Sequence, residues 1–170
     1  IIVVSDAVKD GEISRIEDLA DPKWKGRICT RKGSHVYNRA LLASLIAHHG
    51  EEKAEAWAHS LVSNLARKPQ GNDRAQAKAI WAGECDIAIM NSYYFGKMKF
   101  NTKQPEQQDW AKALTLVFLN QADRGQHVNI SAGGIVKTSD NKQDAVAFLE
   151  WLTSDEAQQI YASVNYEYPV

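Results

Sequence analysis

The chain has 170 residues, of which 44% are hydrophobic and 24% are charged, as in an ordinary folded globular domain. Its 20 basic and 21 acidic side chains leave a formal net charge of −1, so neither nucleic acid nor an anionic membrane is indicated as its main partner. Two cysteines are too few for a disulfide scaffold, and no apolar run approaches the ~20 residues that span a bilayer, so we expect no membrane-embedded segment.

The first segment of the chain predicts a strand, a helical turn and a second strand. Residues 1–4 are a β-branched run that leads into a polar turn. A helical turn over residues 16–20 is expected to stop before Pro22, because proline disfavours helical backbone in the residue that precedes it. Residues 27–30 are expected to form the next strand. Because the chain starts at Ile1 rather than at Met, we expect a fragment or a processed form.

Three helices are predicted next from the spacing of apolar residues. The first covers residues 36–49, with Ser34 as its N-cap, and the second carries an apolar stripe between residues 51 and 65. The third runs from Asp73, as its cap, to Trp81. The first two are expected to form a helical hairpin.

The remainder continues to alternate between strands and helices. Residues 87–90 and 114–119 are apolar runs typical of strands that are covered on both faces, and residues 127–136 form an extended stretch. Two helices close the chain, the first marked by Phe148 and the second opened by Ser154. This order predicts an α/β fold with a mainly parallel sheet flanked by helices.

Ligands of an open parallel sheet bind beyond the carboxyl ends of its strands, and two segments end there with unusual residues. One is the loop of residues 30–38, where Arg31 and Tyr37 lie beside a helix start that is able to hold an anion. The other is the pair Tyr93 and Tyr94, just after an apolar strand. Adjacent tyrosines at a strand end are either packing residues or ligands. If the three tyrosines converge as phenolates, they suit Fe(III) far better than Zn(II) or Cu(I), and an arginine beside them would hold a small anion.

Seven segments of the chain together resemble the periplasmic ferric-ion-binding proteins of bacterial iron ABC transporters. They span nearly the whole chain: Asp21–Ile28, Val36–Asn38, Ala47–Gly50, Ala66–Arg74, Gly83–Ala88, Asn91–Tyr94 and His127–Ser131. The first segment is also similar to solute-binding proteins for polyamines or thiamine, so it indicates the fold more than the ligand. The paired tyrosines and Tyr37 are the part of the resemblance that concerns the ligand.

The resemblance implies one lobe of a type II periplasmic binding protein, with hinge strands that cross between two lobes. Residues 1–5 and 127–137 would be these hinge strands, and residues 6–126 the C-terminal ligand-binding lobe. Residues 138–170 would be helices that pack on the N-terminal lobe of the intact protein. Without that lobe their apolar faces need another partner, so we expect the fragment to dimerise or to swap segments.

The resemblance also implies a function that is not enzymatic. Tyr93, Tyr94 and Tyr37 would bind Fe(III), Arg31 would lie at the site of a synergistic anion such as carbonate, and the N-terminal lobe would supply further ligands. The loaded protein would lie in the periplasm, and we expect the organism to be a Gram-negative bacterium. It would deliver iron to an ABC permease of the inner membrane.

Two other functions stay open on the sequence alone. A solute-binding protein for an organic cation or a small anion, such as a polyamine, thiamine or a phosphate-like ligand, would use the tyrosines as an aromatic wall and Arg31 as a clamp. A small α/β enzyme is the alternative of another class.

The two cysteines also have two interpretations. Cys29 and Cys85 fall in or beside strands that we expect to be near each other, which favours a disulfide. The alternative is a pair of buried free thiols.

Overall fold

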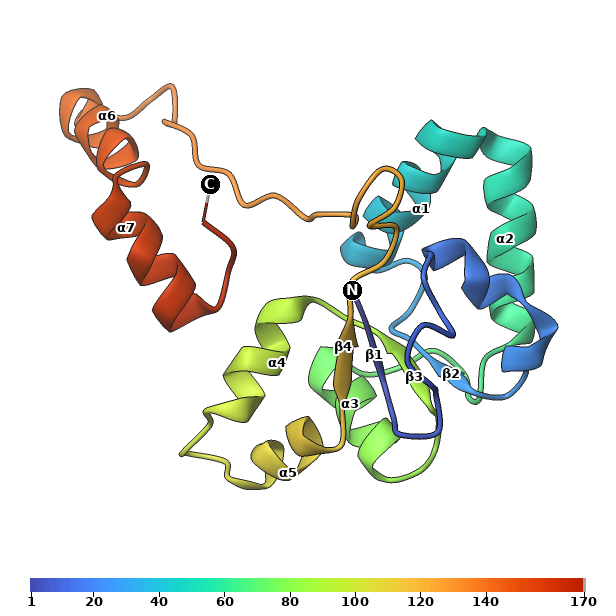
Figure 1. Cartoon of the computed structure of the whole chain (residues 1–170). Helices are drawn as coiled ribbons and strands as arrows, with labels where there is room; N and C mark the ends of the chain where they lie inside the picture. Colours follow the sequence, from blue (N-terminus) through green and yellow to red (C-terminus); the bar gives the residue numbers. More distant parts are fainter. Residues whose placement is uncertain (170) are drawn as a thin grey trace. The chain divides into compact units, whose positions relative to one another are not determined.

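The computed structural model describes residues 1–169 of the chain, which divide into two units, Ile1–Asn129 and a second unit that begins at Ile130. The first unit holds a four-stranded sheet with helices on both of its faces (Figure 1). The second unit holds helices α6 (Lys142–Trp151) and α7 (Asp155–Ile160), followed by a π-helical turn at Tyr161–Asn165. The predicted α/β class is confirmed.

The sheet is mixed rather than mainly parallel. Its strands are β1 (Ile2–Val4), β2 (Ile28–Cys29), β3 (Ile87–Ile89) and β4 (Thr115–Val117), in the order β2-β3-β1-β4. β2 pairs with β3 in parallel, whereas β1 is antiparallel to both β3 and β4. A helical crossover makes the two strands that it connects run in the same direction, but it does not determine the direction of a strand outside the crossover. β1 precedes the first crossover and inserts between β3 and β4 in the opposite direction, so the expectation of a mainly parallel sheet is wrong.

Side chains of the strands alternate between two cores. Ile2 and Val4 of β1 pack in the core beneath α1 (Val36–His49) and α2 (Glu51–Ser63), together with the 3-10 turns η1 (Ile16–Ala20) and η2 (Pro22–Trp24). Val3 points to the opposite core, which is built with α3 (Asp73–Trp81), α4 (Ser92–Lys99) and α5 (Glu106–Lys112). Helices therefore bury both faces of the sheet, which explains the continuous apolar runs in the sequence.

Strand β4 differs from its prediction. It covers Thr115–Val117 rather than residues 114–119, and Thr115 is exposed while Leu116 and Val117 are half-buried. β4 lies at one edge of the sheet and pairs only with β1.

Two helix caps also differ from the prediction, although the bounds of α1 and α3 agree with it. His35, not Ser34, caps α1, and its Nδ1 accepts the backbone N–H of Tyr37 at 3.3 Å. Asn72, not Asp73, caps α3 by accepting the N–H of Ala75 at 3.0 Å. Since Asn is as good a cap as Asp, the carboxylate of Asp73 is available for another role.

Cys29 and Cys85 form a disulfide in the structure. Cys29 ends β2, and Cys85 lies shortly before its parallel neighbour β3, so that their Cα atoms are 6.0 Å apart. Of the two alternatives that the sequence left open, the structure therefore has the disulfide and not the pair of free thiols.

Residues 127–137 form no strand, although the resemblance implies a hinge strand there. No residue of this stretch pairs with a strand of the described sheet. The division between the two units falls inside this stretch, after Asn129.

The second unit shows the predicted pair of helices, and Ser154 caps α7 by accepting the N–H of Ala157 at 3.3 Å. Apolar side chains on these helices are exposed, with Phe148 at 57%, Trp151 at 42% and Ile160 at 46%. Packing of these faces on another lobe, and dimerisation or swapping, stay predictions. No helix in the part of the chain described here combines the length and the apolar character that a membrane crossing requires.

Candidate metal centre

The three tyrosines singled out in the sequence come together in the first unit. Tyr37 is the second residue of α1, and Tyr93 and Tyr94 lie in the first turn of α4. The phenol oxygens of Tyr37 and Tyr93 are 3.0 Å apart, within hydrogen-bond distance. The rings of Tyr93 and Tyr94 pack with their centroids 4.3 Å apart. Residues separated by 56 positions in the chain therefore place their phenol groups side by side.

The starts of two helices determine the electrostatics of this cluster. The positive end of a helix dipole favours negative charge nearby, so the first turns of α1 and α4 suit anionic oxygen atoms. In the metal-free protein, however, burial raises the pKa of Tyr93 above its ordinary value, and the hydrogen bonds with Tyr37 and Tyr94 raise it further. The phenol of Tyr93 therefore keeps its proton more firmly than a free tyrosine, and a bound cation must displace that proton to be coordinated by its oxygen. A trivalent metal ion has the charge to do so.

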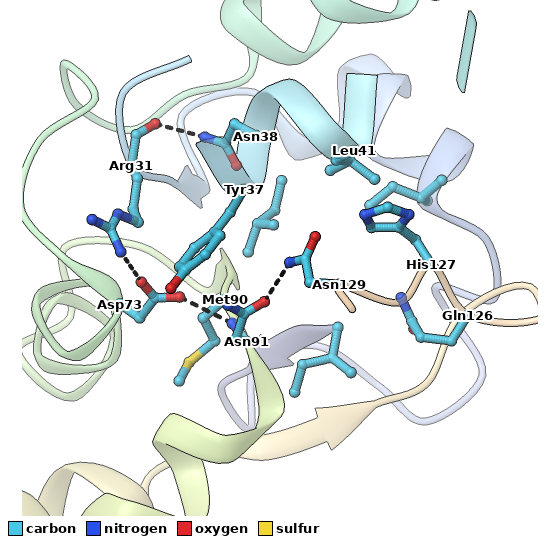
Figure 2. Close-up of a pocket in the computed structure, with 13 residues that line it drawn as sticks. Arg31, Tyr37, Asn38, Leu41, Asp73, Met90, Asn91, Gln126, His127 and Asn129 are labelled. Atoms are coloured by element: carbon cyan, nitrogen blue, oxygen red, sulfur yellow. Dashed lines mark hydrogen bonds and ion pairs between the residues drawn. The ribbon is translucent and has the colours of Figure 1, made fainter. Parts of the chain in front are cut away.

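An ion pair between Arg31 and Asp73 lies beside Tyr37 (Figure 2). Nη1 of Arg31 donates to Oδ2 of Asp73, whose side chain is only 1% exposed, while that of Arg31 is 15% exposed. The other oxygen, Oδ1, accepts the backbone N–H of Asn91 at 3.0 Å, just before α4. Asp73 therefore ties the start of α3 to the loop before α1 and to the start of the helix that carries the tyrosine pair.

Sequence reasoning missed Asp73 because an aspartate at a helix start is usually a cap. The signal that was available is the preceding Asn72, which provides the cap equally well and leaves an aspartate without a local role. Arg31, by contrast, was expected near the site and lies there.

The ion pair changes what can be expected of Arg31. Its charge is already balanced by Asp73, so an external anion would compete with an internal carboxylate. Nε of Arg31 is buried and has no hydrogen-bond partner, and its guanidinium lies 5.3 Å from the centre of the Tyr37 ring. Asn38 holds the loop in place, because its side-chain amide donates to the carbonyl of Arg31 at 2.9 Å. The role of Arg31 at an anion site stays a prediction.

A small cavity of about 40 Å³ opens next to this pair (Figure 2). Its polar lining includes Arg31, Tyr37, Asp73, Asn91, His127 and Asn129. Tyr37 lines the cavity, whereas Tyr93 and Tyr94 do not. Tyr93 is linked to the cavity through the hydrogen bond between its phenol oxygen and that of Tyr37. It has room for one water-sized species.

The segment 126–129 brings two side chains that residue-type reasoning did not assign to the site. The amide of Asn129 donates to Oδ1 of Asn91 at 2.9 Å. Burial lowers the pKa of His127, and its Nε2 is buried with no hydrogen-bond partner. Both residues belong to a sequence segment of the resemblance, which was the signal for them.

Comparison with known proteins places the chain in a family. The family described as bacterial extracellular solute-binding protein matches residues 5–170. Among curated proteins, the chain is 49% identical to iron uptake protein A1 of Synechocystis sp. over 163 residues, which is 96% of this chain and 45% of that protein. It is 31% identical to the major ferric iron-binding protein of Neisseria meningitidis serogroup B, over 95% of this chain and 46% of that one.

Solved structures give the same relationship. Trichodesmium IdiA (FutA), solved with iron and citrate ligands, matches 99% of this chain and 53% of its own with a TM-score of 0.94 and 50% identity. The ferric binding protein from Campylobacter jejuni matches with a TM-score of 0.92 and 40% identity, over 99% and 54% of the two chains. The chain spans about half the length of the curated relatives it matches. From the family match and these neighbours together, we conclude that the chain belongs to the bacterial extracellular solute-binding proteins.

Proposed function

We propose that this chain captures ferric iron through the phenolates of Tyr93, Tyr94 and Tyr37. The observation that carries the proposal is the 3.0 Å contact between the phenol oxygens of Tyr37 and Tyr93, with Tyr94 packed against Tyr93. Phenol oxygens this close can bind one metal ion together. Relatives named as iron uptake and ferric iron-binding proteins match nearly the whole chain, which supports the same cargo.

The chemistry of the donors fits a trivalent ion. Phenolate oxygens are hard, anionic ligands, and three of them balance the charge of Fe³⁺. The helix starts that carry the tyrosines favour this negative charge. A synergistic anion such as carbonate completes the coordination beside Arg31, where it must displace or join the carboxylate of Asp73. Binding of iron then depends on the concentration of that anion.

The chain acts as a binding protein and not as an enzyme, and it supplies part of a larger site. Because it spans about half of its relatives, a second lobe supplies the remaining ligands and closes over the metal. In this proposal the loaded protein resides in the periplasm of a Gram-negative bacterium and delivers iron to an ABC permease of the inner membrane. Release requires opening of the site, protonation of the phenolates or reduction of the metal.

Visible absorption tests the proposal, because ferric phenolates absorb visible light. The protein is titrated with ferric citrate as wild type and as Tyr93→Phe, Tyr94→Phe and Tyr37→Phe. Each substitution is expected to weaken the band, and the pair of substitutions at 93 and 94 to abolish it. Tyr161→Phe, in the second unit, is the matched control and should leave the band unchanged. An identical band in all variants would contradict the assignment of the ligands.

The two alternatives are outcomes of the same experiment. If wild-type protein shows no band, in the 170-residue chain and in the longest natural polypeptide that contains it, the iron proposal fails. Binding of spermidine, thiamine or phosphate, measured by calorimetry, would then favour a solute-binding protein for an organic cation or a small anion. A band that appears only in the longer polypeptide would show that the second lobe is required.

A further inference from the structure

A cation lies over the ring of each tyrosine in the candidate metal centre. The distances from the charged group to the ring centre are 5.3, 5.0 and 5.1 Å for the pairs Arg31 with Tyr37, Lys97 with Tyr93, and Arg74 with Tyr94. The cations come from three different elements, namely the loop before α1, the last turn of α4 and the first turn of α3. Each of the three rings therefore has its own cation, and the three cations come from different parts of the chain.

Two of these cations lack a balancing carboxylate. Arg31 is paired with Asp73, but within residues 1–169 no Asp or Glu lies within ion-pair distance of Arg74 or Lys97. Nε of Arg74 is also buried and has no hydrogen-bond partner. Both side chains are half-buried, so their charges are screened by water only in part. Two uncompensated positive charges therefore face the rings of Tyr94 and Tyr93.

A positive charge beside a phenolate changes how strongly that phenolate donates electrons. It stabilises the electron density on the ring and oxygen, so less of it is transferred to a bound metal. The same charge favours addition of an electron to the metal, so the reduction potential of the site is raised.

We propose that Arg74 and Lys97 are positioning residues that set the donor strength of Tyr94 and Tyr93 toward ferric iron. This inference rests on the proposed function, since it concerns the same phenolates. With both cations in place, the iron-loaded site has a phenolate-to-iron band at higher energy, and a higher reduction potential, than the tyrosines alone would give. The cations do not coordinate the metal themselves.

The experiment removes each charge and then restores it. Arg74→Gln and Lys97→Gln remove a charge, whereas Arg74→Lys and Lys97→Arg keep it. Lys99→Gln is the matched control, because Lys99 is in the same helix and its Nζ lies 5.7 Å from the centre of the Phe100 ring, which cannot bind a metal. Each protein, as the longest natural polypeptide that contains the chain, is loaded with ferric citrate. The wavelength of the visible band and the reduction potential, by spectroelectrochemical titration, are then measured.

Loss of one charge, at 5.0 or 5.1 Å from the ring centre, should move the band to the red and should lower the potential. The charge-retaining variants and Lys99→Gln should match wild type. If wild type shows the band but neither Gln variant shifts it or the potential, the inference is overturned while the ligand assignment stands. If wild type shows no band, the proposed function fails and the inference fails with it. Arg74→Met keeps an apolar stem and replaces Arg74→Gln if that variant does not fold.

Discussion

The buried ion pair of Arg31 and Asp73 gives the sharpest prediction for stability. Asp73→Asn keeps the size of the side chain and keeps an oxygen for the backbone N–H of Asn91, but removes the negative charge. Arg31, only 15% exposed, is then left with an unbalanced charge. Breaking a buried pair by removing one partner typically costs 3–5 kcal/mol. Since Arg31 retains some access to water, we expect the lower end, a loss of about 3 kcal/mol in the free energy of unfolding.

The double variant separates the pair from its surroundings. Arg31→Met leaves the carboxylate of Asp73 buried without its partner, and should cost about 2–3 kcal/mol, because the carboxylate keeps its hydrogen bond from the backbone N–H of Asn91. When Asp73→Asn is combined with Arg31→Met, both charges of the pair are absent, so neither is left buried without a partner. The double variant should therefore be more stable than the sum of the two losses predicts, by about 2 kcal/mol.

The assay is urea unfolding at neutral pH, followed by tryptophan fluorescence, since Trp24 is fully buried in the first unit. Lys112→Met is the control, because Lys112 and Asp109 form an ion pair of 2.8 Å whose side chains are 73% and 60% exposed. Such a surface pair should contribute less than about 1 kcal/mol. Additive losses in the double variant, or a loss with Asp73→Asn no larger than with Lys112→Met, would refute the reasoning.

Three further predictions concern the first unit. Reduction of the Cys29–Cys85 disulfide, which closes a loop of 56 residues, should lower the free energy of unfolding by about 4 kcal/mol on the chain-entropy account, measured by urea unfolding with and without reductant. Burial raises the pKa of Glu17, but its hydrogen bonds outweigh this and lower it to about 2, so stability from Glu17 is complete above pH 4.5 and is lost as the pH falls toward 2. Glu17→Gln should remove that part of the pH dependence in acid unfolding curves, and an unchanged curve would contradict the assignment. Leu45→Ala, at a position 1% exposed in the core beneath α1, should cost 2–5 kcal/mol in thermal or urea unfolding, and a cost below about 1 kcal/mol would show that the core is loosely packed there.

Local patterns predicted most of the helices. The apolar spacing over 36–49 and 73–81 depends on contacts within a few residues, and both helices have the expected bounds. The direction of β1 could not be predicted this way. A β-branched run predicts that a strand forms. It does not indicate the strands between which this strand inserts, or the direction in which it runs. The edge position of β4 has the same origin, because exposure of a strand depends on the whole order of the sheet.

The candidate site shows the same division. Tyr37, Tyr93 and Tyr94 were singled out by their residue type and their places after predicted strands, and the structure brings them together. Asp73 was not, since its role depends on Arg31, 42 positions away in the chain. A pairing over that distance is a property of the folded molecule. The local pattern offered a simpler role for it as a helix cap.

The central claim is that tyrosine phenolates hold the iron, and resonance Raman spectroscopy tests it most directly. The protein is loaded with ferric citrate and excited within its visible band, once with ordinary tyrosine and once with ring-deuterated tyrosine incorporated during expression. The account predicts enhanced vibrations of the tyrosine ring that shift on deuteration and that weaken in Tyr93→Phe and Tyr94→Phe. Iron bound in stoichiometric amount without any enhanced tyrosine vibration would contradict it.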